Sequence, residues 1–150
     1  MKKRNGFTLV EILIVVVILG ILAAIVIPQF SDASEQANLS SLTSNLQTVR
    51  SQIQLYKIQH NGALPGDGDA TFTAALTGVT SIAGATVAVG TSGAVGPYLQ
   101  AIPKNPYVTG ADAATVVEGT TAPTVDGKGW YFNTSTGAFN ANDTAGHAAY

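Results

Sequence analysis

FTLVEILIVVVILGILAAIVI, residues 7–27, is the stretch of sequence that decides the fold, and Glu11 is its single charged residue. At about 1.5 Å rise per residue, a helix of this length crosses the roughly 30 Å hydrocarbon core of a bilayer. The apolar run of an ordinary secretory signal is shorter, at roughly 7 to 15 residues. The stretch therefore predicts one membrane-spanning helix, which we expect to cover residues 7–30.

The charges around this helix predict its orientation and its need for a partner. The basic residues 2–4 favour a cytoplasmic N-terminus, which sends the C-terminal body outward. A carboxylate in hydrocarbon costs at least about 2.5 kcal/mol, and neither an ordinary signal nor a plain membrane anchor offers Glu11 a partner. A cut between Gly6 and Phe7 would give Phe7 a charged α-amino group and place Glu11 in the first helical turn. In a bundle of such helices, Glu11 of one copy can neutralise the amino terminus of a neighbour, and an unpaired charge there is costly.

The motif GFTLVE, residues 6–11, follows a short basic leader and precedes the apolar run. This arrangement resembles the N-terminal signal of type IV pilins and type II secretion pseudopilins. In that family a membrane-embedded prepilin peptidase cleaves after the glycine and methylates the new N-terminal Phe. The resemblance implies a leader at residues 1–6, cleavage between Gly6 and Phe7, N-methylation of Phe7, and a role for Glu11 in assembly.

The helix is expected to continue beyond the membrane. Residues 31–60 contain no Gly or Pro, and apolar residues recur there every three or four positions, as in an amphipathic helix. These apolar positions are Leu39, Leu42, Leu46, Val49, Ile53 and Tyr56. Gly20 and Pro28 are the positions at which the helix should bend, and Asn61-Gly62 should end it. A long curved helix with an amphipathic second half at residues 31–61 again resembles the pilin family.

Residues 62–150 are expected to form a small C-terminal α/β body. Asp69 is the predicted cap of a short helix that runs through Phe72, Ala75 and Leu76 and ends at Gly78. Strands are predicted at residues 85–89, at 115–117, and in a hairpin of 129–133 with 137–140.

The predicted hairpin should place Trp130 and Phe132 on one face and Tyr131 on the other, because side chains alternate along a strand. The expected fold class is α+β, namely a pilin fold. In it a long bent N-terminal helix, membrane-spanning in its first half and amphipathic in its second, packs against a small antiparallel β-sheet.

The composition argues against several classes of site. The 150 residues include no cysteine, which excludes disulfides and thiolate zinc sites. Without the leader, four basic residues face nine acidic ones, a net charge of 4 − 9 = −5, so no basic stripe is available for nucleic acid. The two histidines, His60 and His147, have no partner at motif spacing. We therefore expect neither an enzyme nor a protein whose main partner is nucleic acid.

Two acidic loops are candidates for calcium, which prefers carboxylate and amide oxygens. The first is residues 67–69, and the second lies toward the C-terminus. Weak candidate ligands in the second loop region are Asp126, Asn140, Asn142 and Asp143. Major pseudopilins that resemble this chain can hold calcium in their C-terminal loops. Turn-forming Asp and Asn in solvated loops explain both loops more simply, so we expect no obligatory cofactor and leave calcium open.

The expected function is that of a structural subunit polymerised through its N-terminal helix. The segments GPYL, residues 96–99, and IPKNPY, residues 102–107, resemble the major pseudopilin of type II secretion, although Asn105 and Val108 depart from that pattern. The main expectation is therefore that pseudopilin, and the alternative is a major type IV pilin for adhesion, motility or DNA uptake. A membrane-anchored ligand-binding module is the alternative from a different class.

The family resemblance also implies partners and a location. The partners are other copies of the chain, the prepilin peptidase, a membrane platform protein, a cytoplasmic assembly ATPase and minor pseudopilins. Before assembly the subunit would cross the inner membrane once with its N-terminus in the cytoplasm. After assembly it would belong to a periplasmic or cell-surface filament.

Overall fold

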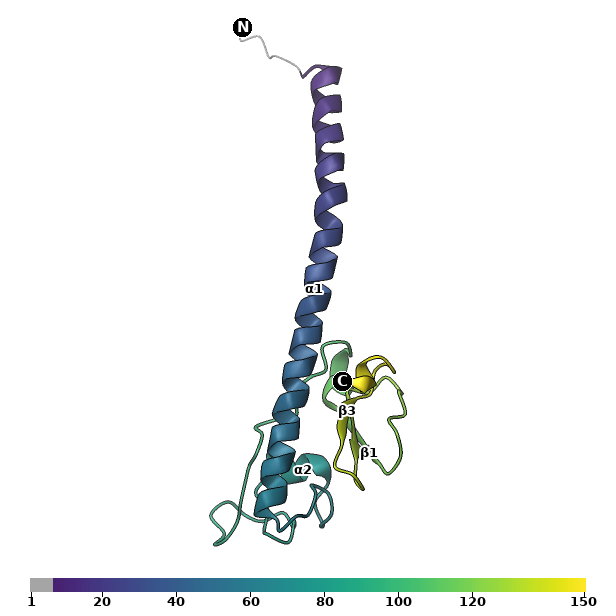
Figure 1. Cartoon of the computed structure of the whole chain (residues 1–150). Coiled ribbons are helices and arrows are strands. Elements are labelled where there is room, and N and C mark those ends of the chain that lie inside the picture. Colours follow the sequence, from purple (N-terminus) through teal and green to yellow (C-terminus); the bar gives the residue numbers. More distant parts are fainter. Residues whose placement is uncertain (1–6) are drawn as a thin grey trace. The chain divides into compact units, whose positions relative to one another are not determined.

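The computed structural model describes residues 7–150, apart from the side chain of Pro28 (Figure 1). The leader expected at residues 1–6, with Gly6, lies outside the described residues. The chain divides into two compact units, Met1–Ala37 and Asn38–Tyr150.

One α-helix, α1, extends over Leu9–Gln59 and is the longest element of the chain. The helix is uninterrupted at Gly20 and Pro28. The bend expected at these two positions stays a prediction. By length and composition, α1 is the one helix among the described residues that could cross a membrane. It ends at an αL cap, where Asn61 and Gly62 have φ values of 54° and 94° and the Gly62 amide donates to the Lys57 carbonyl at 2.8 Å.

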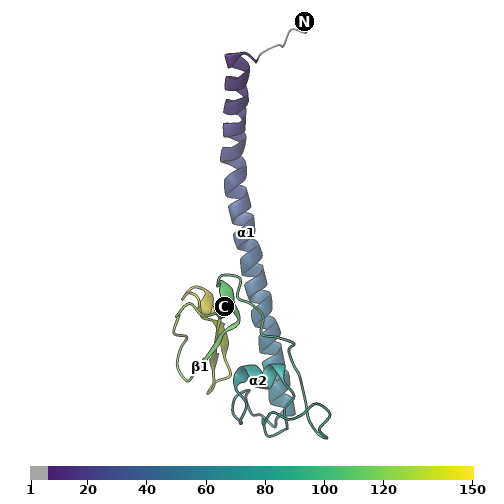
Figure 2. The ribbon, with the colours of Figure 1, turned by 180° about the vertical axis from the view of Figure 1, so that it is seen from behind.

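The apolar stripe of the second half of α1 forms one side of the core of the second unit. The structure buries five of the six predicted stripe positions, and Leu39 is half-buried. The five buried positions are Leu42, Leu46, Val49, Ile53 and Tyr56. Figure 2 shows α2, Phe72–Thr77, beside the last turns of α1, and α2 adds Phe72, Ala75 and Leu76 to the same core.

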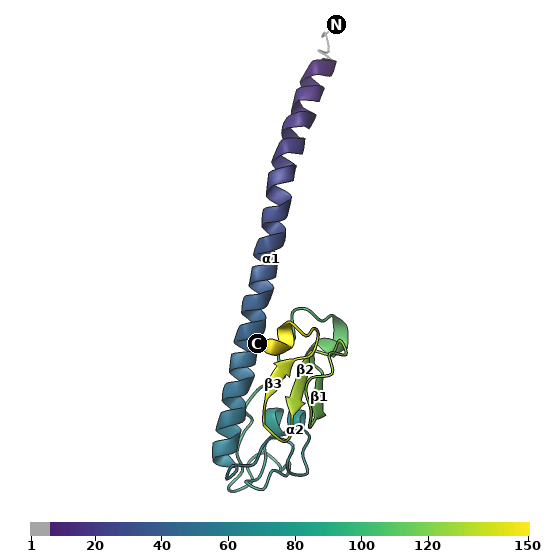
Figure 3. The same cartoon turned by 45° about the vertical axis from the view of Figure 1, so that its right-hand side comes forward.

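The sheet has three strands, β1 (Val116–Gly119), β2 (Trp130–Asn133) and β3 (Phe139–Ala141), in the order β1-β2-β3 (Figure 3). The α+β fold class is thereby confirmed. The expectation of an antiparallel sheet is wrong for β1, which pairs with β2 in parallel, with Val116 opposite Trp130. Residues 120–129 explain the difference, because a connection of this length can carry the chain back to the end from which β1 began.

The predicted hairpin is confirmed by antiparallel pairing of β2 with β3, in which Phe132 lies opposite Phe139. Its turn uses Gly137 at a φ of 76°. Trp130 and Phe132 belong to the core, as predicted for their shared face. Tyr131 lies on the other face and is also buried, with its hydroxyl 3.2 Å from the Thr121 carbonyl.

Two local predictions in the body are wrong. The cap of α2 is Thr71 rather than Asp69, because Thr71 directly precedes the helix and its Oγ1 accepts from the Ala74 amide at 3.3 Å. The helix does end at Gly78, as predicted. No strand forms at residues 85–89, where the described chain has an isolated bridge from Thr86 to Thr80.

Two short 3-10 helices complete the described elements, η1 at Gly110–Ala114 and η2 at His147–Ala149. Arg50 of α1 holds the segment around η2 against the body. Its Nε donates to the Phe139 carbonyl at 2.9 Å and its Nη1 to the Tyr150 carbonyl at 2.8 Å. Partial burial of the guanidinium lowers the pKa of Arg50.

Candidate functional site

The first turn of α1 is closed by a reciprocal pair of side chains, Thr8 and Glu11. The Glu11 Oε2 atom accepts from both the amide and the hydroxyl of Thr8, each at 2.8 Å. In return, Thr8 Oγ1 accepts from the Glu11 amide at 3.3 Å. This is a capping box, in which two otherwise unpaired amides at a helix N-terminus find side-chain acceptors.

The capping box also places the carboxylate where charge is favoured. The N-terminus of a helix carries a partial positive charge, so a carboxylate in its first turn is stabilised there. Glu11 is the single acidic residue of a long apolar segment, and Phe7, four residues before it, has 82% of its surface exposed. A cationic group brought to this end of α1 would therefore find one carboxylate already oriented by Thr8.

The apolar half of α1 has no cover in the single chain. From Leu9 to Ile27 every large apolar side chain is at least 41% exposed. Soluble monomers rarely leave such a large contiguous apolar surface open to water, and surfaces of this kind contact lipid or other proteins. A shallow hollow at the start of the helix is lined by Phe7, Thr8, Leu9, Ile12, Leu13 and Val16.

The other predicted site residues of the helix are Gly6, Gly20 and Pro28. Gly6 lies outside the described residues, while Gly20 and Pro28 lie within α1. A methyl group added at Gly20 would meet nothing within 4 Å, so the described single chain gives no packing reason for a glycine there. Its contribution to a bend therefore remains a prediction.

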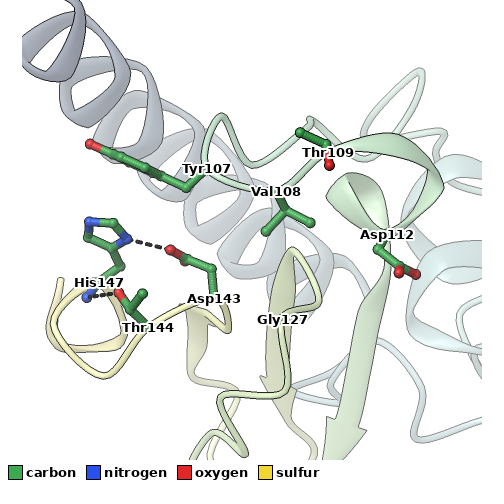
Figure 4. Close-up of a pocket in the computed structure, with 8 residues that line it drawn as sticks. All are labelled: Tyr107, Val108, Thr109, Asp112, Gly127, Asp143, Thr144 and His147. Carbon is green, nitrogen blue, oxygen red and sulfur yellow. Dashed lines mark hydrogen bonds and ion pairs between the residues drawn. The ribbon is translucent and has the colours of Figure 1, made fainter. Parts of the chain in front are cut away.

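A polar hollow of about 460 Å³ lies in the body and is shown in Figure 4. His147 and Asp143 face each other across it through Nδ1 and Oδ2, and the His147 ring lies 4.1 Å from the ring of Tyr107. The expectation that His147 has no partner at motif spacing is wrong, because Asp143 pairs with it. The signal was available, because Asp143 precedes it by four residues, a spacing that brings side chains together in a helical turn.

This hollow does not assemble a catalytic set from the residues around His147. Asp112 is paired with Lys128, whose Nζ lies 2.8 Å from Oδ1, and this hydrogen bond raises the pKa of Lys128. Thr144 faces the amide of His147, not its ring, since Thr144 Oγ1 accepts from that amide at 3.3 Å. The side-chain hydrogen bond of the His147 ring is thus the one with the Asp143 carboxylate, and Thr144 bonds with the backbone of His147 only.

The four weak calcium candidates have their side chains engaged within the protein. Asn142 donates to Asp126 Oδ1 at 2.7 Å and accepts from the Val125 amide at 2.8 Å. Asn140 donates to the Ala148 carbonyl at 2.9 Å, and Asp143 accepts from Asn105 as well as facing His147. Residues 7–150 contain no group of three or more His, Asp or Glu placed to hold a metal. Calcium binding by these four residues stays a prediction.

Comparison with known proteins places the similarity at the N-terminal motif. Residues 1–27 match the family model for the prokaryotic N-terminal methylation motif. Type II secretion system core protein G of Pseudomonas aeruginosa is 39% identical over 59 residues, which cover 39% of this chain and 42% of that protein. Its counterpart in Dickeya chrysanthemi is 37% identical over 60 residues, which cover 40% of this chain and 39% of that protein.

A third relative belongs to a pilus. The type IV narrow pilus major component of Thermus thermophilus is 42% identical over 60 residues, which cover 40% of this chain and 52% of that protein. The chain thus spans about two fifths to one half of the length of these curated relatives. No solved structure matches it. The resemblance to type IV pilins and type II secretion pseudopilins, predicted from the GFTLVE motif, is confirmed over that part of the chain.

Proposed function

We propose that this protein is the structural subunit of a type IV pilus-like filament, specifically the major pseudopilin of a type II secretion system. The observation that carries the proposal is the first half of α1. It joins the methylation motif to an uncovered apolar surface whose single charge is Glu11. An apolar helix of this kind fits a membrane-anchored pilin.

Assembly follows from the chemistry of the first helical turn. Prepilin peptidase cleaves between Gly6 and Phe7 and methylates the amine of Phe7, which stays protonatable. In the filament, Glu11 of one copy accepts that amine from a neighbour, and the two charges neutralise each other in an apolar core. Thr8 orients the carboxylate beforehand, so the subunit waits in the membrane with the acid of its apolar segment already hydrogen-bonded.

The subunit lies in the inner membrane before assembly, and the energy for its assembly comes from other proteins. The subunit has no catalytic role and requires no cofactor, and the energy for extraction from the membrane comes from a cytoplasmic ATPase through a platform protein. The basic residues 2–4 hold the N-terminus in the cytoplasm, with the body on the far side of the inner membrane. Minor pseudopilins and further copies of the chain complete the filament, which is periplasmic or reaches the cell surface.

The first test is the mass of the mature N-terminus, measured on membrane and sheared-surface fractions for the wild type and Glu11→Ala. We expect a start at N-methyl-Phe7 in both proteins and filaments only in the wild type. Glu11→Asp is the matched control, since it keeps the charge and should retain part of the assembly. An uncut Met1, or a start within residues 24–40, would overturn the proposal and favour a membrane-anchored ligand-binding module.

A second candidate, a major type IV pilin, is favoured by the 42% identity to the pilus component of Thermus thermophilus. Deletion of the gene separates the two candidates. Loss of an exported protein from the medium supports the pseudopilin, whereas loss of natively expressed surface fibres with secretion intact supports the pilin.

A further inference from the structure

The two residues at which α1 ends form a candidate site of chemical modification. Asn61 lies just beyond the helix, is exposed, and directly precedes Gly62. An asparagine followed by glycine is the pair most open to deamidation. Glycine has no Cβ, so nothing hinders the approach of its backbone nitrogen to the asparagine side chain. Residues 7–150 contain no second Asn-Gly pair, so Asn61 is the position at which we expect this reaction.

Deamidation at this pair consumes water and needs no other reactant. The Gly62 nitrogen forms a bond to Cγ of Asn61 while the bond from Cγ to Nδ2 breaks, and Nδ2 takes up the proton of the Gly62 nitrogen and leaves as ammonia. Water then opens the five-membered succinimide ring. Breakage of the new bond gives aspartate. Breakage of the original backbone bond gives isoaspartate, in which the main chain passes through the side chain.

The surroundings of Asn61 leave its side chain free to react. The side-chain amide forms no hydrogen bond with another described residue. The φ of Asn61 is 54°, in the left-handed region, which asparagine adopts more readily than most residues. A methyl group added at Gly62 would meet nothing within 4 Å, so the described chain leaves room for the ring at this point.

The cap of α1 restrains the other reactant, the Gly62 nitrogen. Its N–H donates to the Lys57 carbonyl at 2.8 Å, and this is the proton that must leave before the nitrogen can attack. The hydrogen bond holds the proton in place and directs the N–H back toward the helix. The reaction therefore needs the last turn of α1 to open first, and helix ends open locally more often than the whole fold.

We propose that Asn61 is a deamidation site of this protein, and that the cap of α1 sets the rate of the reaction. The products weaken the cap in turn. Both place a carboxylate at the C-terminal end of α1, where the partial charge of the helix is already negative. Isoaspartate also adds one carbon to the main chain and moves the Gly62 amide away from the Lys57 carbonyl. These residues all belong to the unit Asn38–Tyr150, and the reaction does not depend on filament assembly.

The test is peptide mapping by mass spectrometry of the full-length chain in detergent, incubated at mildly alkaline pH with and without urea. The measurement detects the replacement of the Asn61 side-chain NH2 by OH, and chromatography separates aspartate from isoaspartate. We expect conversion at Asn61 to be at least tenfold faster in urea, because unfolding removes the cap. Asn140, which precedes an alanine, is the internal reference and should convert at least fivefold more slowly than Asn61 in urea.

Two variants separate the modification from its effect on the cap. Asn61→Gly keeps the left-handed conformation without a side-chain amide, so it should show no conversion at residue 61 and the wild-type amide exchange at Gly62. Asn61→Asp reproduces one product, and its Gly62 amide should exchange at least twofold faster than in Asn61→Gly. Equal exchange in these two variants would overturn the weakening of the cap. Equally fast conversion with and without urea would overturn control by the cap, and no conversion of Asn61 in urea would overturn the site.

Discussion

The two halves of α1 are one helix, yet they relate to the rest of the chain in opposite ways. The apolar side chains from Leu9 to Ile27 are at least 41% exposed, whereas those of Leu42, Leu46, Val49, Ile53 and Tyr56 are at most 1% exposed. The first half is the more hydrophobic, so hydrophobic content alone does not make a core. A narrow stripe on an otherwise polar helix can be covered by one small sheet, but a helix that is apolar on every side needs lipid or other copies.

The largest expected effect contrasts a leucine from each half. Leu46→Ala should lower the free energy of unfolding of the body by about 2–5 kcal/mol, because Leu46 is fully buried and leaves a cavity. Leu19→Ala removes the same atoms from a side chain that is 58% exposed, and should change that free energy by less than about 0.5 kcal/mol. Urea unfolding of the full chain in detergent, followed through Trp130, measures both. Equal losses would mean that the first half of α1 supports the body.

The cap of α1 allows a smaller test in the exposed half. Thr8→Val removes the hydroxyl that bonds with Glu11 and should destabilise the first turn by about 1 kcal/mol, which corresponds to roughly fivefold faster amide exchange at residues 9–12. Thr8→Ser keeps the hydroxyl and should exchange at the wild-type rate. Hydrogen exchange in detergent micelles makes the measurement, and equally slow exchange in Thr8→Val would contradict the capping role.

The same contrast explains how much of the fold could be predicted from the sequence. The buried stripe of α1 and the β2–β3 hairpin depend on spacings of a few residues, and both were found in this way. Parallel pairing of β1 with β2 depends on the path of residues 120–129, whose sequence contains no local signal for its direction. The α2 cap was predicted at Asp69 but lies at Thr71. Both residue types can cap a helix, and only the position of the first turn decides between them.

Some residues of the candidate site could likewise be identified from the sequence, whereas their long-range contacts could not. The assembly motif is contiguous, so Phe7 and Glu11 could be identified without a structure, although the hydrogen bonds between Thr8 and Glu11 appear only in it. In the body, the contact of Asp143 with Asn105 joins residues 38 positions apart. Asp143 was one of the weak calcium candidates in the sequence, and nothing local in the sequence indicates that the Asn105 amide donates to it.

A glycine in each region gives a further contrast. Gly20→Ala should stabilise α1 by up to about 1 kcal/mol, because alanine is the better helix former and the added methyl group meets nothing within 4 Å. Gly129→Ala should destabilise the body, because its methyl group would lie 2.1 Å from the Ala113 carbonyl oxygen. Amide exchange near residue 20 and urea unfolding of the body measure the two effects. Faster exchange in Gly20→Ala would mean that the helix needs the glycine, as expected if it bends there.

The smallest expected effect concerns alkaline pH and the residue that ties the end of α1 to the body. The Tyr98 hydroxyl donates to Gln59 Oε1 at 2.6 Å. Burial, with a contribution from the neighbouring Tyr56, raises the pKa of Tyr98 to about 12, above the roughly 10 of an unfolded tyrosine. The unfolded chain therefore loses this proton first, so the stabilisation is complete below pH 10 and is lost as pH rises toward 12.

Tyr98→Phe should flatten this alkaline decline while lowering stability at neutral pH by no more than about 1 kcal/mol through loss of the hydrogen bond. Gln59→Ala is the matched control, since it removes the same hydrogen bond but keeps the ionisable hydroxyl. It should lose a similar amount at neutral pH and still decline above pH 10. Urea unfolding at pH 8, 10 and 11.5 distinguishes the two variants. If Tyr98→Phe declined as steeply as Gln59→Ala, the alkaline sensitivity of the body would lie in another group, and Tyr98 would act on α1 only through its hydrogen bond and its ring contacts with Tyr56 and His60.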